Sequence, residues 1–361
     1  MPLEQIIRQR IVNEGPLSFR DFMEMALYYP GYGYYTSARE KIGVPGDFYT
    51  SSNVSPAFGA MIARQLLEMK SLLNGPDFTI IEYGAGNGTL CLQIMDYLEI
   101  HAQDETVRYV IIEKSPFLQE VQRRLLGARV AWVEDIRELS PVNGCVLSNE
   151  LVDNFSVHQV VMKEKLMEVF VDYNNGFVEL LRPASMPLQQ YFSDLKVTLP
   201  FEFRTEVCLE AEGWLAAIGK ALNSGFVITI DYGGTSADLY SPMRRLGTLV
   251  AYHKHQVSDN LYVNLGAQDI TAHVNFSALA LIGHRRGLEY TGYRDQGSFL
   301  RALGFEKYLV SLRTPGGDYI AQSGREEFIV HILLQDMGKK FKVLIQQKNC
   351  PPVALQGLKP F

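Results

Sequence analysis

Short apolar runs alternate along this chain with stretches whose apolar residues recur at helical spacing. Each run has the length of one strand, and polar or glycine-rich turns separate it from the helical stretch that follows. Strands that alternate with helices in this way form parallel sheets. The pattern therefore predicts an α/β fold, with a mostly parallel Rossmann-like sheet and helices on both faces. The predicted core strands are 79–83, 109–113, 129–133, 144–149 and 225–231.

Two further patterns complete the predicted elements. Period-two alternation between polar turns predicts a β-meander over 157–181. Helical spacing returns later and precedes a last pair of strands. The predicted helices are 56–73, 90–98, 117–126, 213–222, 276–285, 296–303 and 326–334, and the late strands are 288–291 and 342–347.

The order of these elements suggests a division of the chain into three parts. Residues 1–75 form a helical and Gly/Tyr-rich N-terminal segment, and 156–206 form a β-rich insertion. The core sheet takes 76–155 and 207–361, with an inserted segment at 232–287.

The turn after the first core strand is the most informative segment. It reads E-Y-G-A-G-N-G, so Gly84, Gly86 and Gly88 fall on alternate positions after Glu82. Glycines let a backbone approach a ligand closely and adopt torsions closed to other residues. The third glycine comes one residue earlier than in the dinucleotide fingerprint, and the acid would repel a pyrophosphate. S-adenosyl-L-methionine is cationic and carries no phosphate, so we predict that Glu82, Gly84, Ala85, Gly86 and Gly88 bind it.

The next two strands supply further cofactor candidates. Glu113 ends the second apolar run, where a carboxylate can accept both ribose hydroxyls, although a surface glutamate at a strand end is the alternative. Asp135 and Ile136 follow the third strand, at the place where this kind of fold contacts the adenine amino group. The predicted cofactor set therefore runs across three adjacent strand ends.

The fourth strand ends in the candidate chemical site, S-N-E-L-V-D. Glu150 and Asp153 are suited to clamp a guanidinium, and either can accept the proton that leaves an amine acceptor. Asn149 either contacts the methionine part of the cofactor or fixes the loop. The competing interpretation is a helix N-cap, because Asn followed by acids also begins helices well.

Acceptor-side candidates lie in later segments. Asp231 ends the fifth strand, and we expect it to border the same crevice. Asp269 and His273 either contact the acceptor or hold a loop. His253 and His255 share a side if extended, but no nearby residue completes a ligand set, and we predict no metal.

Composition restricts the function classes. The 361 residues are 47% apolar and 20% charged, as in ordinary globular proteins, and the net charge of −6 argues against a nucleic-acid interface. Four scattered cysteines suggest a reducing compartment, and no run is long enough to span a membrane. With an acidic N-terminal stretch, these features predict a cytoplasmic protein. The oligomeric state is left open, with a homodimer as one option.

Several motifs together resemble the MidA-like methyltransferases, and the resemblance extends over nearly the whole chain. It implies a class I methyltransferase fold with S-adenosyl-L-methionine as donor. That family includes the mitochondrial arginine methyltransferase that assists assembly of respiratory complex I. The motifs are E-x-G-A-G-x-G at 82–88, E-K-S at 113–115, S-N-E-L-V-D-N at 148–154, D-Y-G at 231–233, Q-D-I-T-A-H-V-N-F-S at 268–277, P-G-Y-G-Y-Y at 30–35 and G-D-F-Y-T-S at 46–51.

The resemblance also implies symmetric dimethylation of a protein arginine, and it adds Asp47 to the acceptor side. The Gly/Tyr-rich stretches 28–35 and 43–52 would be either a lid over the cofactor or a loop packed on the core. Asn154 and Asn275 stand where the family more often has Ala and Asp. A small-molecule methyltransferase and a cofactor-binding assembly factor without catalysis are the alternative functions. A nicotinamide-dependent oxidoreductase is disfavoured by the glycine spacing.

Overall fold

The structure is a computed structural model that describes residues 2–37, 50–73, 75, 77–103, 106–254 and 256–360. The chain forms two units, and the predicted N-terminal segment 1–75 is divided between them. The insertion unit comprises Met1–Phe48, Val152–Trp214 and Gly233–Ile282. The sheet unit comprises Tyr49–Leu151, Leu215–Tyr232 and Gly283–Phe361.

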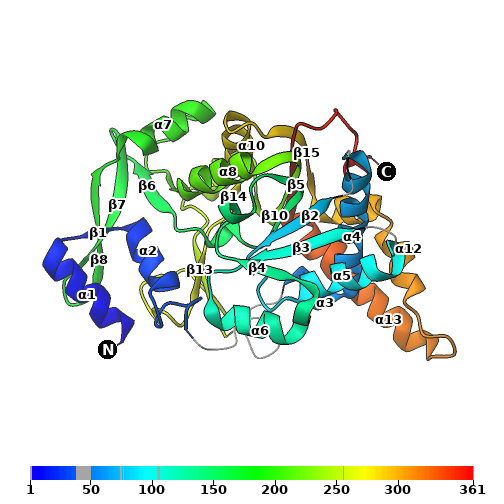
Figure 1. Cartoon of the computed structure of the whole chain (residues 1–361). Helices are drawn as coiled ribbons and strands as arrows, with labels where there is room; N and C mark the ends of the chain where they lie inside the picture. Colours follow the sequence, from blue (N-terminus) through cyan, green and yellow to red (C-terminus); the bar gives the residue numbers. More distant parts are fainter. Residues whose placement is uncertain are drawn as a thin grey trace. The chain divides into compact units, whose positions relative to one another are not determined.

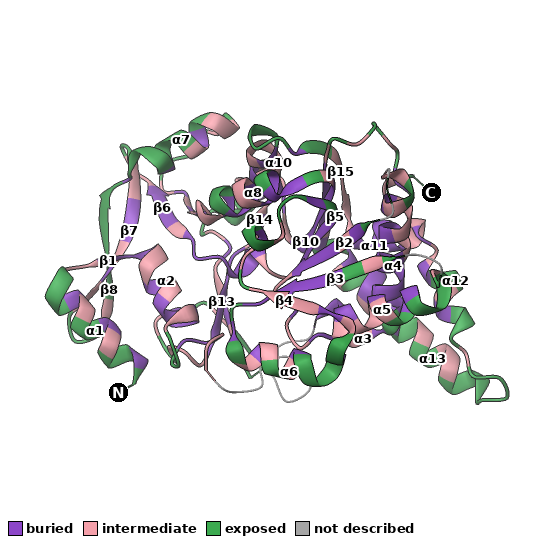
Figure 2. Ribbon diagram, in the orientation of Figure 1, coloured by how far each residue is buried: buried purple, intermediate pink, exposed green. Residues whose placement is uncertain are grey.

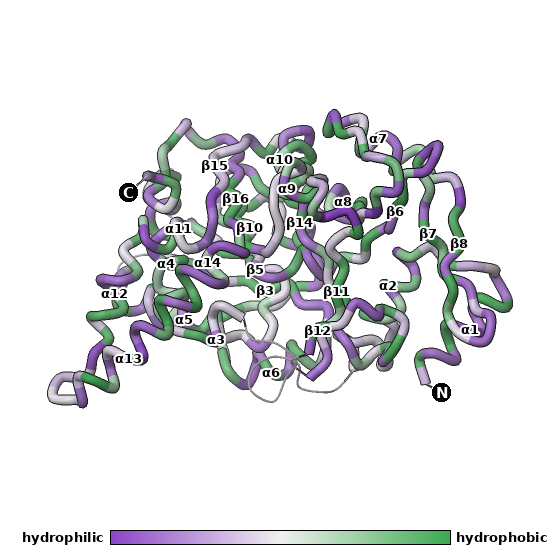
Figure 3. Tube along the Cα trace, turned by 180° about the vertical axis from the view of Figure 1, so that it is seen from behind, coloured by the Kyte–Doolittle hydropathy of each residue, from purple (hydrophilic) through white to green (hydrophobic). Residues whose placement is uncertain are grey.

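The sheet unit is built on the strands that the apolar runs predicted. Their order is β15-β16-β10-β5-β2-β3-β4, and the strands from β10 to β4 are all parallel (Figure 1). At the other edge β16 runs antiparallel to both β10 and β15, and Figure 3 shows this edge from behind. The mostly parallel α/β sheet is thus confirmed. The strands are β2 (Phe78–Tyr83), β3 (Val107–Ile112), β4 (Ala131–Val133), β5 (Val142–Asn149), β10 (Leu222–Gly234), β15 (Glu289–Asp295) and β16 (Phe341–Lys348).

The helices of this unit begin at recognisable N-terminal signals. Ser55 and Ser115 each accept a backbone N–H of the helix that follows, and each precedes a proline whose fixed φ suits the first turn. The helices are α3 (Ser51–Val54), α4 (Pro56–Leu72), α5 (Thr89–His101), α6 (Pro116–Leu126), α11 (Gln296–Ala302), α12 (Phe305–Ser311), α13 (Tyr319–Val330), the π-helical η5 (His331–Asp336) and α14 (Met337–Lys340). Short 3₁₀ turns are η1 (Gly127–Arg129), η2 (Ile136–Leu139) and η6 (Gln356–Leu358).

The central strands form the floor of the sheet unit's core. Ile80, Leu147 and Ile228 are fully buried, and they belong to one apolar cluster with residues of α4 and α5. Figure 2 shows β2 and β5 coloured as buried over most of their length (Figure 2). Parallel strands covered on both faces need such continuous apolar runs, which is why the sequence revealed them.

The insertion unit contains two antiparallel sheets. The first has the order β1-β7-β6-β9, with β8 paired to β7, and it contains the predicted meander. The second has the order β12-β11-β13. The strands are β1 (Leu17–Ser18), β6 (His158–Met162), β7 (Leu166–Tyr173), β8 (Phe177–Pro183), β9 (Arg204–Val207), β11 (Val250–His253), β12 (Gln256–Ser258), β13 (Asp269–Thr271) and β14 (Val274–Asn275), the last paired with the end of β10.

Helices pack on these sheets. Phe22 and Leu27 of α2 are fully buried with residues of β6 and β7. The helices are α1 (Leu3–Glu14), α2 (Phe19–Tyr28), α7 (Met186–Leu195) and α9 (Ser236–Leu239), with 3₁₀ turns η3 (Val152–Asn154) and η4 (Pro242–Arg244). Helices α8 (Glu210–Ala221) and α10 (Phe276–Arg285) each have residues in both units. Helix α7 was not predicted within the β-rich 156–206 stretch.

The Gly/Tyr-rich stretch is packed turn structure as far as it is described. Tyr34 is fully buried, and its backbone N–H donates to the carbonyl of Ala26 in α2. Residues 38–49, which include Asp47 and most of the predicted 43–52 stretch, lie outside the described residues. Among the residues that are described, no helix combines the length and the apolarity needed to cross a membrane.

Gly144 in β5 gives a test of the sheet's close packing. Its φ is +154°, and a Cβ there would lie 1.9 Å from the carbonyl oxygen of Thr79. We expect Gly144→Ala to lower the free energy of unfolding by roughly 2–4 kcal/mol, because the parallel strands cannot separate without loss of their ladder. Gly324→Ala is the matched control: it lies in the exposed helix α13 with open space around it, and should raise stability by up to about 1 kcal/mol. Urea unfolding compares the two variants, and equal stabilities would contradict the packing argument.

Candidate active site

The glycine turn follows β2 and leads directly into α5. Gly84, Gly86 and Gly88 have φ of +64°, +56° and +85°, values that other residues rarely adopt. A Cβ at Gly84 would lie 2.8 Å from the Cδ1 atom of Leu151. Gly88 is the N-cap of α5 and has no side chain to cap it. The turn therefore places bare backbone beside the positive end of a helix.

Glu82 is buried on the sheet below this turn. It is 2% exposed, and the Tyr109 hydroxyl donates to its Oε2 atom at 2.8 Å. Burial raises the pKa of Glu82 to about 7, with the charge of Glu113 adding to the rise and the bond from Tyr109 opposing it. The carboxyl group is therefore poised to lose a proton near neutrality. A cation close to it would favour that loss.

Glu113 follows β3, and its carboxylate accepts hydrogen bonds from neighbouring segments of the sheet unit. The backbone N–H of Ser115 donates to Oε1 at 2.9 Å, and the side-chain amide of Gln122 donates to Oε2 at 3.1 Å. The same amide donates to the carbonyl of Gly86 at 2.8 Å. Gln122 was not predicted as a site residue. The available signal was its place on the buried face of α6, between Leu118 and Leu126.

Asp135 and Ile136 lie just after β4. Both carboxylate oxygens of Asp135 accept from the Arg137 guanidinium, each at 2.7 Å. These bonds hold the pKa of Asp135 below its usual value. Ile136 is 1% exposed. Asp135 therefore begins the turn η2 and anchors Arg137, and its predicted contact with adenine stays a prediction.

Glu150 has an unusual backbone conformation just past the end of β5. Its φ is +54°, in the left-handed region that side chains other than glycine seldom occupy. Its N–H donates to the carbonyl of Ile230 at 2.9 Å, and its Oε1 accepts from the N–H of Ser51 at 3.3 Å and the amide of Asn149 at 3.2 Å. Such strained residues cluster at functional sites, where the surroundings hold them in place.

Buried polar groups surround Glu150. Asp231 is fully buried, and its Oδ2 accepts from the N–H of Leu151 at 3.2 Å, which braces the Glu150 loop. Within the described residues, the Asn149 Oδ1 and Ser148 Oγ atoms are buried and make no hydrogen bond. The site thus combines a glycine turn, buried acids and these Asn149 and Ser148 oxygens. This combination suits a ligand that is cationic and rich in hydrogen-bonding groups. The site residues therefore fit S-adenosyl-L-methionine.

The remaining predicted residues lie in the insertion unit. Asp153 and Asp269 are 4% and 2% exposed. The Tyr35 hydroxyl donates to Asp269 Oδ2 at 2.8 Å, and the N–H of Ala272 donates to the Asp153 carbonyl at 3.1 Å. Burial raises the pKa of Tyr35, and the charges of Asp269 and Asp153 raise it further. The structure therefore brings these two acids near one tyrosine.

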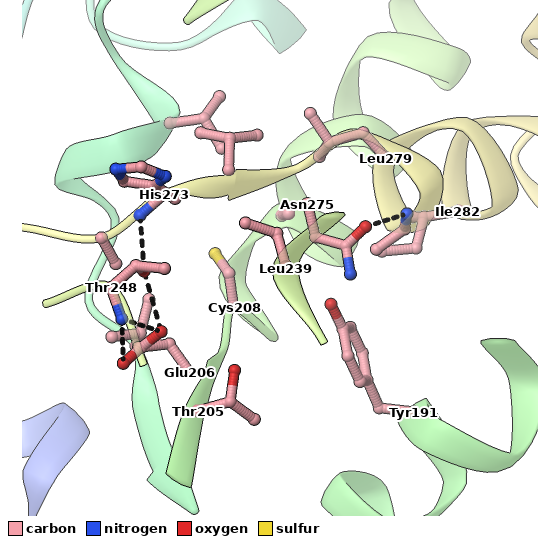
Figure 4. A pocket seen from close by; sticks show the side chains of 16 residues that line it. Tyr191, Thr205, Glu206, Cys208, Leu239, Thr248, His273, Asn275, Leu279 and Ile282 are labelled. Carbon is pink, nitrogen blue, oxygen red and sulfur yellow. Dashed lines mark hydrogen bonds between the residues drawn. The ribbon is translucent and has the colours of Figure 1, made fainter. Parts of the chain in front are cut away.

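His273 lines a small cavity of the insertion unit, drawn in Figure 4. The cavity has a volume of about 30 Å³, room for about two water molecules. Burial lowers the pKa of His273 to about 4, and Arg244 adds to this, so the imidazole is neutral at physiological pH. Its backbone N–H donates to Thr248 Oγ1, which in turn donates to the partly buried Glu206.

Asn275 lies at the other side of this cavity, with the Tyr191 hydroxyl pointing towards it (Figure 4). Its Oδ1 accepts from the N–H of Ala278, and its amide donates to the Tyr240 hydroxyl at 3.0 Å. Asn275 thus holds the start of α10 in place. His253 binds the carbonyl of Ala267 through Nδ1 at 2.7 Å, and His255 lies outside the described residues.

The predicted cofactor residues are therefore gathered at one edge of one sheet. Glu82, Glu113 and Asn149 come from the carboxyl ends of β2, β3 and β5, where open α/β sheets bind their ligands. The strand order, with antiparallel β16 between β10 and β15, and the glycine turn after β2 define a class I S-adenosyl-L-methionine-dependent methyltransferase.

The chain belongs to the family described as "Putative S-adenosyl-L-methionine-dependent methyltransferase", which matches residues 61–294. A COG1565 superfamily member from Burkholderia thailandensis, crystallised with S-adenosyl-homocysteine, is 28% identical, with a TM-score of 0.89 over 98% of this chain and 94% of that one. The protein is thus a methyltransferase whose cofactor is S-adenosyl-L-methionine.

Two curated relatives are similar over most of the chain. The protein arginine methyltransferase NDUFAF7 homolog of Drosophila melanogaster, a mitochondrial protein, is 28% identical over 95% of this chain and 84% of its own. Its human counterpart, protein arginine methyltransferase NDUFAF7, is 24% identical over 84% of this chain and 74% of its own. Both are named as mitochondrial, so the predicted cytoplasmic location is wrong.

The raised pKa of Glu82 leads to a prediction about stability. In the unfolded chain this carboxyl has its usual pKa of 4.5, against about 7 in the fold. Between these values the folded protein holds a proton that the unfolded chain releases, so stability falls as pH rises through this window. The Glu82→Gln variant lacks this titration. We therefore expect the unfolding free energy of the variant minus that of the wild type to increase by roughly 2–3 kcal/mol as pH is raised from 5 to 8. Urea unfolding of both proteins measures this, and a difference that stays constant with pH would contradict it.

Proposed function

We propose that this methyltransferase acts on an arginine side chain of a protein substrate. Two observations support the proposal. The relatives from fly and human are named protein arginine methyltransferases. The Glu150 carboxylate is held past the end of β5 by the N–H of Ser51 and the amide of Asn149, and this is the observation that carries the proposal.

The chemistry asks little of the protein besides alignment and charge placement. S-adenosyl-L-methionine supplies a methyl group that is bound to a positively charged sulfur. When the methyl group is transferred, the sulfur is left as a neutral thioether. An arginine nitrogen must lose a proton as its new C–N bond forms. In our proposal the Glu150 carboxylate orients the guanidinium by charged hydrogen bonds and accepts that proton.

The cofactor-binding roles follow from the same arrangement and stand as proposals. Glu113 would accept the ribose hydroxyls, and the backbone of Gly84 to Gly88 would lie against the cofactor. Glu82 would stabilise its positive charge, and Asn149 would receive a hydrogen bond from the methionine part. Ile136 would pack against the adenine. Asp153, Asp269 and His273 are assigned to the acceptor side, and Asp231 supports the Glu150 loop.

The acceptor can be tested directly. We expect labelled methyl groups from the donor to appear on a protein of a mitochondrial extract when this enzyme is added. Mass spectrometry of the labelled protein locates the residue and distinguishes monomethyl from dimethyl arginine. Transfer should cease when that arginine is replaced by lysine in the purified substrate. Label confined to small molecules, or retained after the Arg→Lys change, would refute an arginine acceptor.

Glu150→Gln tests the proton acceptor. We expect kcat to fall by about 10²–10⁴-fold, because the amide cannot take the proton, with the KM for the donor changed by no more than about threefold. Titration calorimetry with S-adenosylhomocysteine should show nearly unchanged affinity. Glu120→Gln, on the exposed face of α6, is the control and should leave kcat unchanged. If Glu150→Gln retains full kcat while donor binding persists, the catalytic role is wrong. If cellular function survives its loss of activity, a non-catalytic assembly role is favoured.

A further inference from the structure

We infer that Gln122 is a positioning residue for the cofactor, which holds the ribose-binding carboxylate against the glycine turn. The inference rests on the proposed roles of Glu113 and of Gly84 to Gly88. Gln122 itself is fully buried in the middle of α6. It joins three segments of the sheet unit that are far apart in sequence: the turn after β2, the end of β3, and β4.

The side-chain amide of Gln122 forms a hydrogen bond with each of these segments. Nε2 donates to the Gly86 carbonyl at 2.8 Å and to Glu113 Oε2 at 3.1 Å. Oε1 accepts from the indole N–H of Trp132 at 2.9 Å. An amide NH₂ has two hydrogens, so both are used in these two bonds, and the indole N–H of Trp132 donates to the amide oxygen.

These neighbours determine the orientation and the identity of the side chain. A carbonyl and a carboxylate can only accept, and an indole N–H can only donate, so the amide has one orientation that satisfies all three. Glutamate at this position would place a second carboxylate against Glu113 and the Gly86 carbonyl. Leucine or methionine would remove all three hydrogen bonds, which lie at partly or fully buried positions. Glutamine is the residue that the site requires.

The consequence concerns the cofactor's ribose end. Glu113 Oε1 accepts from the N–H of Ser115 and Oε2 accepts from Gln122, so Gln122 helps to set the plane of the carboxylate. The same amide donates to the Gly86 carbonyl and so fixes where that carbonyl points, in a turn whose three glycines have positive φ. One side chain therefore couples the conformation of the turn to the direction of the ribose acceptor.

A neighbouring glutamine on the same helix offers a matched control. Gln119 lies half-buried one turn earlier, and its Nε2 donates to the backbone carbonyl of Glu113 at 2.7 Å. Replacing it removes a bond to the same residue without touching its carboxylate or the glycine turn. Gln122→Leu thus removes the bonds to the Glu113 carboxylate and the Gly86 carbonyl, whereas Gln119→Leu leaves both in place.

The experiment measures S-adenosylhomocysteine affinity by titration calorimetry on the full chain, with steady-state kinetics and thermal unfolding beside it. We expect Gln122→Leu to weaken binding and raise the donor KM by roughly 10- to 100-fold, with kcat at saturating donor kept within about threefold. Gln119→Leu should change affinity by less than about threefold. Gln122→Leu with unchanged affinity, or with an affinity loss matched by Gln119→Leu, would overturn the inference.

A double-mutant cycle separates positioning from general damage to the fold. If Gln122 acts through Glu113, the change Gln122→Leu should cost much less affinity in a Glu113→Ala background than in the wild type. Equal costs in both backgrounds would show that Gln122 acts on structure alone. If Glu113→Ala itself leaves affinity unchanged, the proposed ribose contact fails, whereas a strong effect of Glu113→Ala beside a silent Gln122→Leu refutes only the role of Gln122.

Should Gln122→Leu fail to fold, Gln122→Glu provides the same test through its pH dependence. A protonated glutamate keeps one donor and one acceptor, whereas the ionised form opposes both Glu113 and the Gly86 carbonyl. S-adenosylhomocysteine affinity of this variant, relative to wild type, should recover as pH is lowered from 8 to 6. A ratio that is independent of pH would contradict the positioning role.

Discussion

The sheet unit depends on how it accommodates carboxylates buried at the ends of parallel strands. Glu82, Glu113 and Asp231 are each less than 10% exposed, and burial of an ionised carboxylate without partners is very costly. The structure meets each with donors: the Tyr109 hydroxyl, the Ser115 N–H with Gln122, and the N–H groups of Leu151 and Tyr232. The hydrogen bonds that stabilise these buried acids therefore also fix the loops that carry the site.

Two of these acids also influence each other. The charge of Glu113 contributes to the raised pKa of Glu82, so the two carboxylates together make the ligand edge of the sheet unfavourable for further negative charge. This favours a cationic cofactor over a dinucleotide phosphate, as the glycine spacing also indicates. Binding of a cation would lower the pKa of Glu82 again, and so we expect donor binding to release a proton near neutral pH.

Much of this arrangement was visible in the sequence, because it follows from local rules. Apolar runs such as 225–231 mark fully buried parallel strands, and the alternate glycines after Glu82 mark the turn. Gln122 was not visible, because an amide in an amphipathic helix is usually solvent-exposed, and one of its hydrogen-bond partners is Trp132 of β4, which the helix pattern does not indicate. Helix α7 was missed for a similar reason: its ten residues sit within a stretch dominated by strand periodicity.

Glu150 shows how such constraints fix the position of a side chain that we propose to be catalytic. Its left-handed φ is unfavourable for a glutamate, and nothing in the sequence letters S-N-E-L indicates it. The conformation is maintained because the Glu150 N–H bonds to Ile230 and the next N–H bonds to Asp231, both from β10. The parallel pairing of β5 with β10 thus determines where the chain leaves the strand. Ser51 and Asn149 then hold the carboxylate, so its direction is set within the fold. In the role that we propose for Glu150, little reorganisation would remain for the transfer step.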